Sequence, residues 1–405
     1  MSRSWRLVAL LTFTATASYL ARVNVSVAGV EMMREFGLSQ QAMGRIFSAF
    51  LLGYALCQIP GGMLADRFGA VRVLGIAALG WAACTASMAA AGGGIALLLI
   101  ARLALGVTEA PTFPAAAQAI SRWMPEHQRA RANGLVIAAI GRGSAVAPPL
   151  ISFVMVRWGW RTALLISAIP AAVAGLGWLL VRAPSTAHAP RPASAPPALL
   201  PRSRPFVLLT LSYTLQGYVG YIFVYWFYIY LVDVRHFDLL RGALFGSLPW
   251  LLSIVSIPLG GLLFDKWGRH RRLVPITGLA GSGILTAVGA YAAHPYLAAT
   301  CLALATALVL SVEGPFWATM TRIAGERSGA AGGAMNMGSN LGGFISPALT
   351  PVLAAAMGWE AALTVSASLA VVAAVLWLGI PTDANGTAET DSLTASPGNG
   401  REYAD

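Results

Sequence analysis

The chain has 405 residues, of which 57% are hydrophobic and only 11% are charged, and its mean hydropathy is +0.68. A soluble globular domain carries about 25% charged residues, so this composition excludes an ordinary water-soluble protein. The formal net charge is +11. The basic residues lie mainly in loops between apolar segments, where they face anionic lipid headgroups, so nucleic acid is excluded as a partner.

Twelve apolar segments are long enough to cross a bilayer, which takes about 20 residues in a helix. The first segment has a basic start but no small-residue cleavage site after it, so it is interpreted as a membrane span and not as a removed signal peptide. The predicted fold class is therefore an all-α membrane protein with 12 transmembrane helices. The expected spans are roughly 8–30, 44–64, 72–92, 95–118, 133–156, 161–181, 206–231, 243–264, 273–292, 295–320, 332–356 and 361–380.

The basic residues are distributed unevenly between the two sets of loops. If the N-terminus is cytoplasmic, the cytoplasmic loops hold seventeen arginines and lysines and the outer loops hold six. This is the positive-inside bias, and it places both termini in the cytoplasm. Alanine and arginine are abundant and lysine occurs once, which is typical of a GC-rich bacterial genome and predicts the inner membrane as the location.

The sequence repeats itself at an offset of about 199 residues. The segment "GGMLADRFG" at 61–69 returns as "GGLLFDKWG" at 260–268, and the pair Gly159-Trp160 returns as Gly358-Trp359. Such parallel repeats predict two six-helix halves that are related by an axis along the membrane normal. The expected domains are an N-terminal bundle at 1–182, a Pro/Ala/Ser-rich cytoplasmic linker at 183–205, a C-terminal bundle at 206–380 and a disordered cytoplasmic tail at 381–405.

The repeated motif resembles one that is found in a known transporter family. Gly62-x-x-x-Asp66-Arg67-x-Gly69 lies between spans 2 and 3, and Gly261-x-x-x-Asp265-Lys266-x-Gly268 lies between spans 8 and 9. With two halves of six spans, this pattern resembles the major facilitator superfamily. The resemblance implies the fold of that family, in which Asp66, Arg67, Asp265 and Lys266 form a latch between the halves that holds one conformation.

Five ionisable residues lie within the apolar spans: Arg22, Arg102, Glu109, Arg142 and Glu313. Each costs roughly 2.5–3.5 kcal/mol at the centre of a membrane helix, and such groups mark substrate or proton paths. Arg102 and Glu109 are seven residues apart, so they share one helix face about 10 Å apart. Together with Arg22 they leave a net charge of +1, which suits an anion, because a guanidinium can grip a carboxylate through two hydrogen bonds.

Three further segments resemble one particular family within this superfamily. The segments "LARVNVSVAGVEMM" in span 1, "ARLALGVTEAPTFPA" at 101–115 and "GGAMNMGSNLGGFISPALTP" at 332–351 resemble the anion:cation symporter family. That family includes bacterial sugar-acid transporters, sialin and the vesicular glutamate transporters. At Ala21 the sequence departs from some bacterial members, which have an acidic residue before the arginine, and this leaves the number of coupled protons open.

This second resemblance assigns roles to individual residues. It implies that Arg22 contacts the substrate carboxylate and that Tyr54 supports the contact. Arg102 and Glu109 would be the charge pair of span 4, with Glu109 taking the proton. Trp317 and Asn340 would line the pocket from the second half.

Several roles remain open from the residues themselves. Arg22 could instead form an interhelical pair with Glu109 alone, or extend to the interface. Arg142 is either a third anion contact or a structural partner of Glu313 or Glu109. Glu313 is either a second proton site or the buried partner of an arginine.

Two polar groups of the second half are also candidates for the pocket. Asn336, Ser339 and Asn340 cluster within span 11 and either bind substrate hydroxyls or hydrogen-bond to neighbouring helices. A set of tyrosines in span 7 shares one face by its i, i+3, i+7 spacing and either lines the pocket or packs. These tyrosines are Tyr218, Tyr221 and Tyr225.

The predicted function is proton-coupled symport, that is, uptake of a small organic anion such as a sugar acid, a hydroxy-dicarboxylate or an aromatic carboxylate. The alternatives are a proton-antiport exporter of amphipathic compounds and a transporter-like anion sensor. No nucleophile–base arrangement suggests an enzyme, and no histidine has metal-ligand spacing. We expect no metal or cofactor, and a monomer in the lipid bilayer whose partners are the anion and protons.

Overall fold

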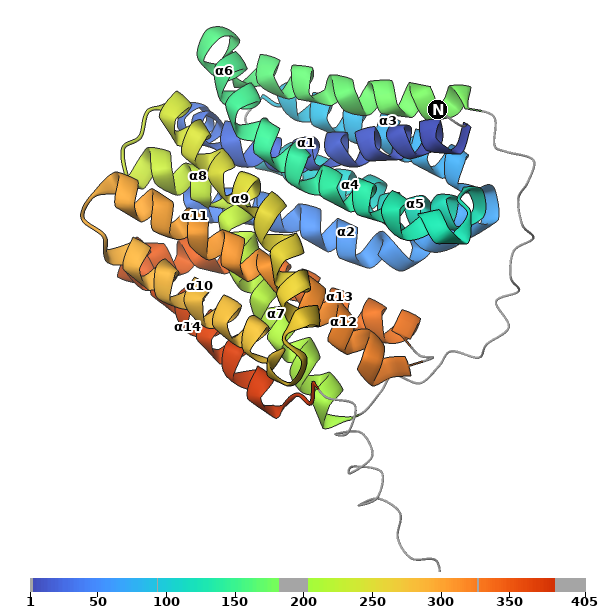
Figure 1. Cartoon of the computed structure of the whole chain (residues 1–405). Coiled ribbons are helices and arrows are strands. Elements are labelled where there is room, and N and C mark those ends of the chain that lie inside the picture. Colours follow the sequence, from blue (N-terminus) through green and yellow to red (C-terminus); the bar gives the residue numbers. More distant parts are fainter. Residues whose placement is uncertain (1–2, 93, 182–202, 326–327, 383–405) are drawn as a thin grey trace, which may run out of the picture.

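The computed structural model describes residues 3–92, 94–181, 203–325 and 328–382, and nearly all of them are helical (Figure 1). The predicted linker and tail lie outside the described residues except at their edges. Helix α7 begins at Arg204, so the last two residues assigned to the linker are helical.

The N-terminal half contains six helices that run back and forth along one direction. They are α1 (Arg3–Phe36), α2 (Gln40–Phe68), α3 (Ala70–Ala89), α4 (Ile95–Glu109), α5 (Thr112–Trp123) and α6 (Glu126–Leu180). Helices α4 and α5 form one interrupted span. Helix α6 contains two spans.

The C-terminal half repeats this pattern with more interruptions. Its elements are α7 (Arg204–Tyr225), α8 (Phe227–Ile229), the π-helical turn η1 (Tyr230–Val234), α9 (Leu239–Lys266), the 3₁₀ turn η2 (Gly268–His270), α10 (Leu273–Tyr291), α11 (Pro295–Ser311), α12 (Glu313–Ala324), α13 (Ser328–Met357), α14 (Trp359–Leu376) and the 3₁₀ turn η4 (Trp377–Gly379).

Eleven helical stretches of the described chain are long and apolar enough to cross a membrane. One of them, α6, has 55 residues. A straight helix of that length would measure about 82 Å, more than twice the roughly 30 Å of the hydrocarbon core. It turns back at Gly159, whose φ of 80° is open to glycine but costly for other residues. The predicted twelve spans are therefore confirmed.

The same turn recurs in the second half. Gly358, between α13 and α14, has φ 87° and ψ 161°, close to the φ 80° and ψ 163° of Gly159. These are the two glycines of the repeated Gly-Trp pair, so the sequence repeat corresponds to a repeat of backbone structure. The two-bundle fold predicted from the sequence is confirmed.

The halves touch at one end of the molecule. We call the end where α6 ends and α7 begins the linker end, and the opposite end the far end. At the far end an ion pair of 3.3 Å joins Arg34 of α1 to Asp233 of η1. Nearby, the hydroxyls of Ser152 in α6 and Tyr228 in α8 lie 2.8 Å apart.

Helix α2 shows where the contact between the halves stops. From the far end inward, the Ser48 hydroxyl donates to the carbonyl of Phe344 in α13 at 2.7 Å. Further along, the Asn336 side chain donates to Gln58 at 3.1 Å. Beyond this point Gly61 packs on Pro111 of its own half. The structure is closed at the far end, and the halves diverge toward the linker end (Figure 1).

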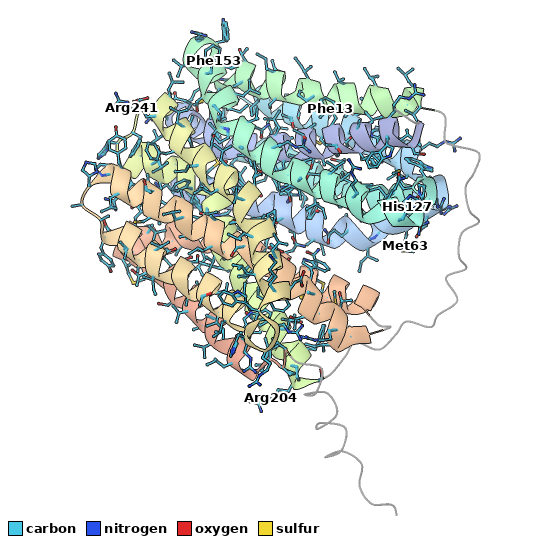
Figure 2. All side chains as sticks on the ribbon, viewed as in Figure 1. Phe13, Met63, His127, Phe153, Arg204 and Arg241 are labelled. Atoms are coloured by element: carbon cyan, nitrogen blue, oxygen red, sulfur yellow. The ribbon has the colours of Figure 1, made fainter. Side chains whose placement is uncertain are left out.

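The labelled side chains of Figure 2 mark the two ends of the molecule. Phe153 and Arg241 lie at the far end, one on each half. His127 and Arg204 lie well apart at the linker end.

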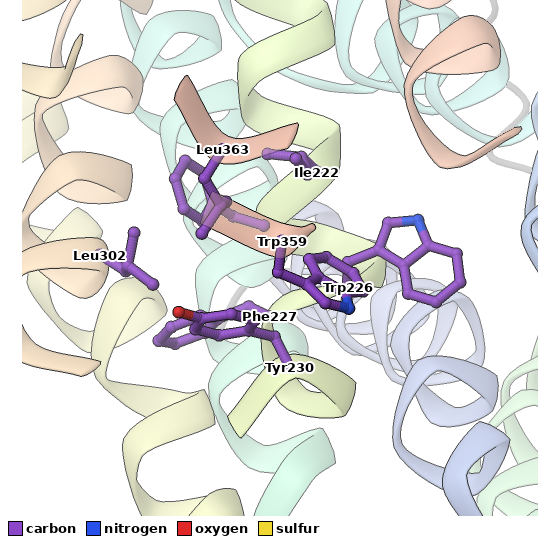
Figure 3. A pocket seen from close by; sticks show the side chains of 8 residues that line it. Ile222, Trp226, Phe227, Tyr230, Leu302, Trp359 and Leu363 are labelled. Carbon is purple, nitrogen blue, oxygen red and sulfur yellow. The ribbon is translucent and has the colours of Figure 1, made fainter. Parts of the chain in front are cut away.

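A small pocket in the C-terminal half is lined by apolar and aromatic side chains alone (Figure 3). Its lining residues are Ile222, Phe223, Trp226, Phe227, Tyr230, Leu302, Trp359 and Leu363. Because none of them is charged, this pocket does not supply a site for an ionised substrate.

Candidate functional site

The fourth span is broken in its middle, and the break positions a carboxylate. Helix α4 ends at Glu109 and α5 begins at Thr112. Pro111 lies in the break, and without an N–H group it cannot donate to the carbonyl of Val107. Irregular backbone at membrane depth is tolerated where protein surrounds it, and Glu109 is completely buried.

Glu109 forms a buried ion pair with Arg22 of α1. Its Oε1 accepts hydrogen bonds from Arg22 Nη2 at 2.7 Å and Nε at 3.2 Å. The Ser18 hydroxyl donates to the same oxygen at 2.8 Å. Arg22 is only 2% exposed. The expectation that Glu109 pairs with Arg102 of its own span was wrong, because the structure pairs it with the arginine of α1.

Aromatic rings surround the Arg22 guanidinium. Its Cζ lies 4.5 Å from the ring centre of Tyr19, 4.6 Å from that of Tyr54 and 4.9 Å from that of Phe50. Desolvated cation–π contacts of this kind stabilise a buried guanidinium by about 2 kcal/mol or more. Tyr54, which the sequence associated with Arg22, is therefore in contact with it.

Arg102 has no carboxylate partner among the described residues. It is fully buried, and none of its three guanidinium nitrogens makes a hydrogen bond to the described part of the chain. Its Cζ lies 4.9 Å from the ring centre of Phe50, so this ring contacts both arginines. Close packing at Gly106 allows this, since a Cβ atom there would lie 2.0 Å from the Phe50 carbonyl oxygen.

Two further polar atoms near Arg102 lack hydrogen bonds within the described structure. They are Oε2 of Glu109 and the hydroxyl of Tyr225, and both are buried. Tyr225, Glu109 and Arg22 are the ionisable groups that act electrostatically on Arg102, and the Tyr225 hydroxyl is the group placed to accept from its guanidinium, although the two do not meet hydrogen-bond geometry. The site thus combines two arginines, one carboxylate and unsatisfied buried polar atoms, which makes it the candidate site for a polar ligand.

The fourth span of the second half carries a separate carboxylate cluster. Glu313 begins α12 and accepts hydrogen bonds from the Tyr213 hydroxyl at 2.8 Å and from Gln216 Nε2 at 3.0 Å, both of α7. Trp317, one turn further along α12, is 39% exposed, and Asn340 of α13 is 5% exposed.

Arg142 does not belong to either cluster. Its side chain is exposed, and Nη2 donates to the carbonyl of Leu135 in its own helix at 3.1 Å. It forms no ion pair with Glu313 or Glu109, so of the two alternatives for Arg142 the structural pairing was wrong. Glu313 likewise has no arginine partner among the described residues.

The aromatic face of α7 packs against the first half. The ring of Tyr221 stacks on Tyr225 with centroids 6.0 Å apart, and Tyr225 stacks on Phe47 of α2 at 4.9 Å. Of the two roles considered for the tyrosines of this span, lining the pocket or packing, Tyr225 therefore has the packing role. Asn336 makes an inter-half hydrogen bond to Gln58, as the helix–helix alternative states.

The four residues of the expected latch form no ion pair in the described structure. Asp66 accepts a hydrogen bond from Gln118 of α5, within its own half. The Arg67 guanidinium lies over the ring of Phe68, and Asp265 and Lys266 are exposed. A latch at the linker end would be open in this conformation, because the halves diverge there.

Sequence reasoning missed five residues that contact the site charges: Ser18, Tyr19, Phe50, Tyr213 and Gln216. Helical spacing was the available signal. Ser18 is four residues before Arg22, Phe50 is four residues before Tyr54, and Tyr213 and Gln216 are three apart, so each pair shares a face. The described residues contain no group of three or more His, Cys, Asp and Glu that could hold a metal ion.

Comparison with known proteins identifies the family. Residues 11–347 match the family described as the Major Facilitator Superfamily. The chain is 32% identical over 359 residues to the "Probable sulfoacetate transporter" of Cupriavidus necator, with 82% of each chain covered. It is 27% identical to the hexuronate transporter of Bacillus subtilis, with 90% of this chain and 92% of that chain covered. It is 26% identical to the D-galactonate transporter of Escherichia coli, with 93% and 95% covered.

Solved structures show the same fold. A bacterial homolog of the human lysosomal transporter Spinster, in an inward-facing and occupied conformation, has a TM-score of 0.81 at 20% identity, with 93% of this chain and 97% of that chain covered. The D-xylose–proton symporter has a TM-score of 0.77 at 17% identity, with 94% and 98% covered. At these identities the likeness shows the fold alone.

Proposed function

The chain belongs to the Major Facilitator Superfamily and is therefore a multi-span membrane transporter and not an enzyme; from this premise we propose that it imports a small organic anion together with protons by alternating access. The substrate class is a small carboxylate or sulfonate, such as a sugar acid, a hydroxy-dicarboxylate, an aromatic carboxylate or sulfoacetate. The relatives named above are described as carriers of sulfoacetate, hexuronate and D-galactonate, all of which are organic anions.

The observation that carries this proposal is the buried, unpartnered guanidinium of Arg102. A buried charge without a partner is costly, at several kcal/mol per ion after relaxation. Arginine stays protonated at any working pH, so it cannot relieve this cost by losing its proton. An anion that bridges Arg102 and Arg22 would supply the missing charge, and a planar carboxylate could take two parallel hydrogen bonds from either guanidinium.

The Arg22–Glu109 pair suggests how a proton is coupled to the anion. While Glu109 is ionised, it occupies two of the Arg22 donors. Protonation of Glu109 removes the competing charge and frees Arg22 for the substrate. The proton and the anion then favour each other's binding by the same free energy, which is the definition of thermodynamic coupling. Tyr54, Trp317 and Asn340 would complete the pocket, with Tyr221 beside them.

The conformation fits one step of such a cycle. With both termini cytoplasmic, as the positive-inside bias indicates, the structure is closed toward the outside and the open end faces the cytoplasm. The latch formed by Asp66, Arg67, Asp265 and Lys266 would close when the molecule opens to the outside. We infer the bacterial inner membrane as its location.

Uptake by proteoliposomes tests the proposal. The wild type should accumulate sulfoacetate, D-galactonate or a hexuronate when an inward proton gradient is imposed. Arg102→Gln and Arg22→Gln should abolish this uptake. Arg157→Gln removes an exposed arginine whose guanidinium lies over the Phe153 ring, away from the site, so it serves as the matched control. If no anion moves and a lipophilic amine is carried in exchange for protons, the chain is an exporter and the proposal is wrong.

A further inference from the structure

We propose that Glu313 is a second proton-binding carboxylate, located in the C-terminal half and separate from Glu109, and that it contributes a proton to the transport cycle. The contribution to transport rests on the proposed function. The proton site itself rests on the surroundings of Glu313 alone.

Only neutral groups hydrogen-bond to Glu313 in the described structure. Tyr213 donates to Oε2 at 2.8 Å and Gln216 donates to Oε1 at 3.0 Å. Glu109 differs in this respect, because two of its three hydrogen bonds come from the Arg22 guanidinium. The two carboxylates therefore differ in their counter-charge: the Arg22 guanidinium neutralises Glu109, whereas no cation hydrogen-bonds to Glu313 within the described structure.

The charged and titratable groups of the surrounding helices do not balance Glu313. Helix α12 packs against α7, α9, α10, α11 and α13. Over their described lengths α10, α11 and α13 have no charged residue at all. Helix α7 presents Tyr213 and has its one charge, Arg204, at its first residue.

The remaining charges lie at helix ends. In α9 they are Arg241 near its start, which pairs with Asp238, and Asp265 and Lys266 in its last turn, which are exposed. Arg322, the other charge of α12, lies nine residues beyond Glu313, about 13.5 Å along the helix. Its guanidinium donates to the carbonyls of Thr382 and Pro381.

An ionised carboxylate in this position is costly, because Glu313 has lost most of its contact with water and has no cation to offset its lost hydration. A proton is the simplest partner. Access is available, since Glu313 is partly exposed and Trp317 beside it is 39% exposed. Neutral Glu313 can keep both observed hydrogen bonds, because each of its oxygens still accepts.

Glu313 and Glu109 each lie beside the break in the fourth span of their own half. Both halves have the pattern Glu-x-Pro in their fourth span: Glu109-Ala110-Pro111 in the first and Glu313-Gly314-Pro315 in the second. Glu109 is the last residue of α4, before the break, and Glu313 is the first residue of α12, after the break. Tyr19 lies within electrostatic range of both carboxylates. One carboxylate therefore lies at the broken helix of each half.

Infrared spectroscopy of the full chain in lipid tests the proton site without any substrate. A pH titration should show the C=O stretch of a protonated carboxyl that Glu313→Gln removes and that Tyr213→Phe shifts by deleting a hydrogen bond. Glu360→Gln, at the exposed start of α14, should leave this band in place. If Glu313→Gln leaves every carboxyl band unchanged while Tyr213→Phe shifts none, Glu313 carries no proton and the inference is overturned.

Proteoliposome uptake of sulfoacetate and D-galactonate tests the contribution to transport. With a pH difference of one unit, each coupled proton adds about tenfold to the accumulation ratio. Glu313→Gln should therefore lower accumulation about tenfold, and an unchanged ratio would overturn the coupling role. If the wild type moves neither anion, the proposed function fails for these substrates, and the infrared result still decides whether Glu313 binds a proton.

Discussion

Replacing Glu109 by glutamine should make the stability of the protein depend on a bound anion. In the wild type the Glu109 carboxylate neutralises part of the charge of Arg22 and Arg102, and in the variant only an anion can do so. The substitution preserves the shape of the side chain but removes its charge, so Arg22 and Arg102 remain without a counter-charge. Breaking a buried ion pair by removing one partner costs about 3–5 kcal/mol. This range applies to ion pairs that are buried and in direct contact. Arg22 and Glu109 are 2% and 0% exposed, and their closest atoms are 2.7 Å apart.

The two arginines already repel each other in the wild type, and in the variant no carboxylate offsets this repulsion. Each guanidinium lies 4.9 Å from the ring centre of Phe50, so their centres are at most about 10 Å apart. With an effective dielectric constant of about 20, two like charges at this distance repel by about 1.7 kcal/mol. A bound carboxylate would offset this repulsion and the lost pair together. Saturating anion should therefore stabilise Glu109→Gln more than it stabilises the wild type.

Unfolding in detergent micelles, followed by tryptophan fluorescence, measures both effects. Without anion, Glu109→Gln should lose on the order of 3–5 kcal/mol, and an anion at 100 times its Kd should restore about 2.7 kcal/mol. Glu31→Gln is the matched control, because it breaks an exposed i,i+3 pair with Arg34; such pairs contribute about 0–1 kcal/mol. If Glu109→Gln were as stable as this control without anion, the buried pair would not have the assigned role.

Three further predictions concern the surroundings of the site. Arg102→Met should raise the stability of the anion-free protein by on the order of 1 kcal/mol, because it removes an unpartnered buried charge; equal or lower stability would mean that Arg102 is already compensated. Gly106→Ala should cost about 1–3 kcal/mol in unfolding measurements, because its Cβ would lie 2.0 Å from a backbone carbonyl of α2; wild-type stability would show that the two helices separate easily. Burial raises the pKa of Asp233 at the far end, although Arg34 opposes the shift. The Asp233 carboxyl therefore binds its proton more tightly when the far end is closed than when it is open. Acidification then favours closure of the far end, and this stabilisation is lost as the pH rises through the raised pKa. Spin-label distances between the far ends of α2 and α9 should shorten as the pH falls, and Asp233→Asn should remove that dependence.

The fold followed from the sequence because its signals are long and redundant. Each span needs about 20 apolar residues, and the repeat gives two independent views of the same topology. The Gly-Trp pairs mark the same turn in each half because both Gly159 and Gly358 have positive φ. Helix interruptions were less visible, since Pro111 lies within a segment that is long enough to be predicted as one continuous span.

The partners of the buried charges could not be predicted in the same way. Helical periodicity placed Arg102 and Glu109 on one face, and both are buried, but periodicity within one helix does not determine which arginine of which helix is nearer. Packing of α1 against the break in α4 decides this in favour of Arg22. Likewise, an apolar span does not reveal the direction of Arg142, which is exposed.

The role of Glu313 depended on residues far away in sequence. Its donors Tyr213 and Gln216 are 100 and 97 positions earlier, on another helix. The sequence therefore left open whether an arginine or a neutral group faces it. Within the described residues only neutral groups hydrogen-bond to Glu313, which favours the proton-site alternative over the ion pair.

Anion-driven proton entry tests the central claim most directly. Proteoliposomes with a pH-sensitive dye in the lumen receive sulfoacetate, a hexuronate or D-galactonate from outside, with the membrane potential clamped. For the wild type, at least one of these anions should acidify the lumen, and Arg102→Gln should abolish the signal. An anion that enters without acidifying the lumen would contradict proton coupling. A quaternary ammonium compound that makes the lumen alkaline in proteoliposomes but not in protein-free liposomes, while none of the anions acidifies it, would contradict symport itself.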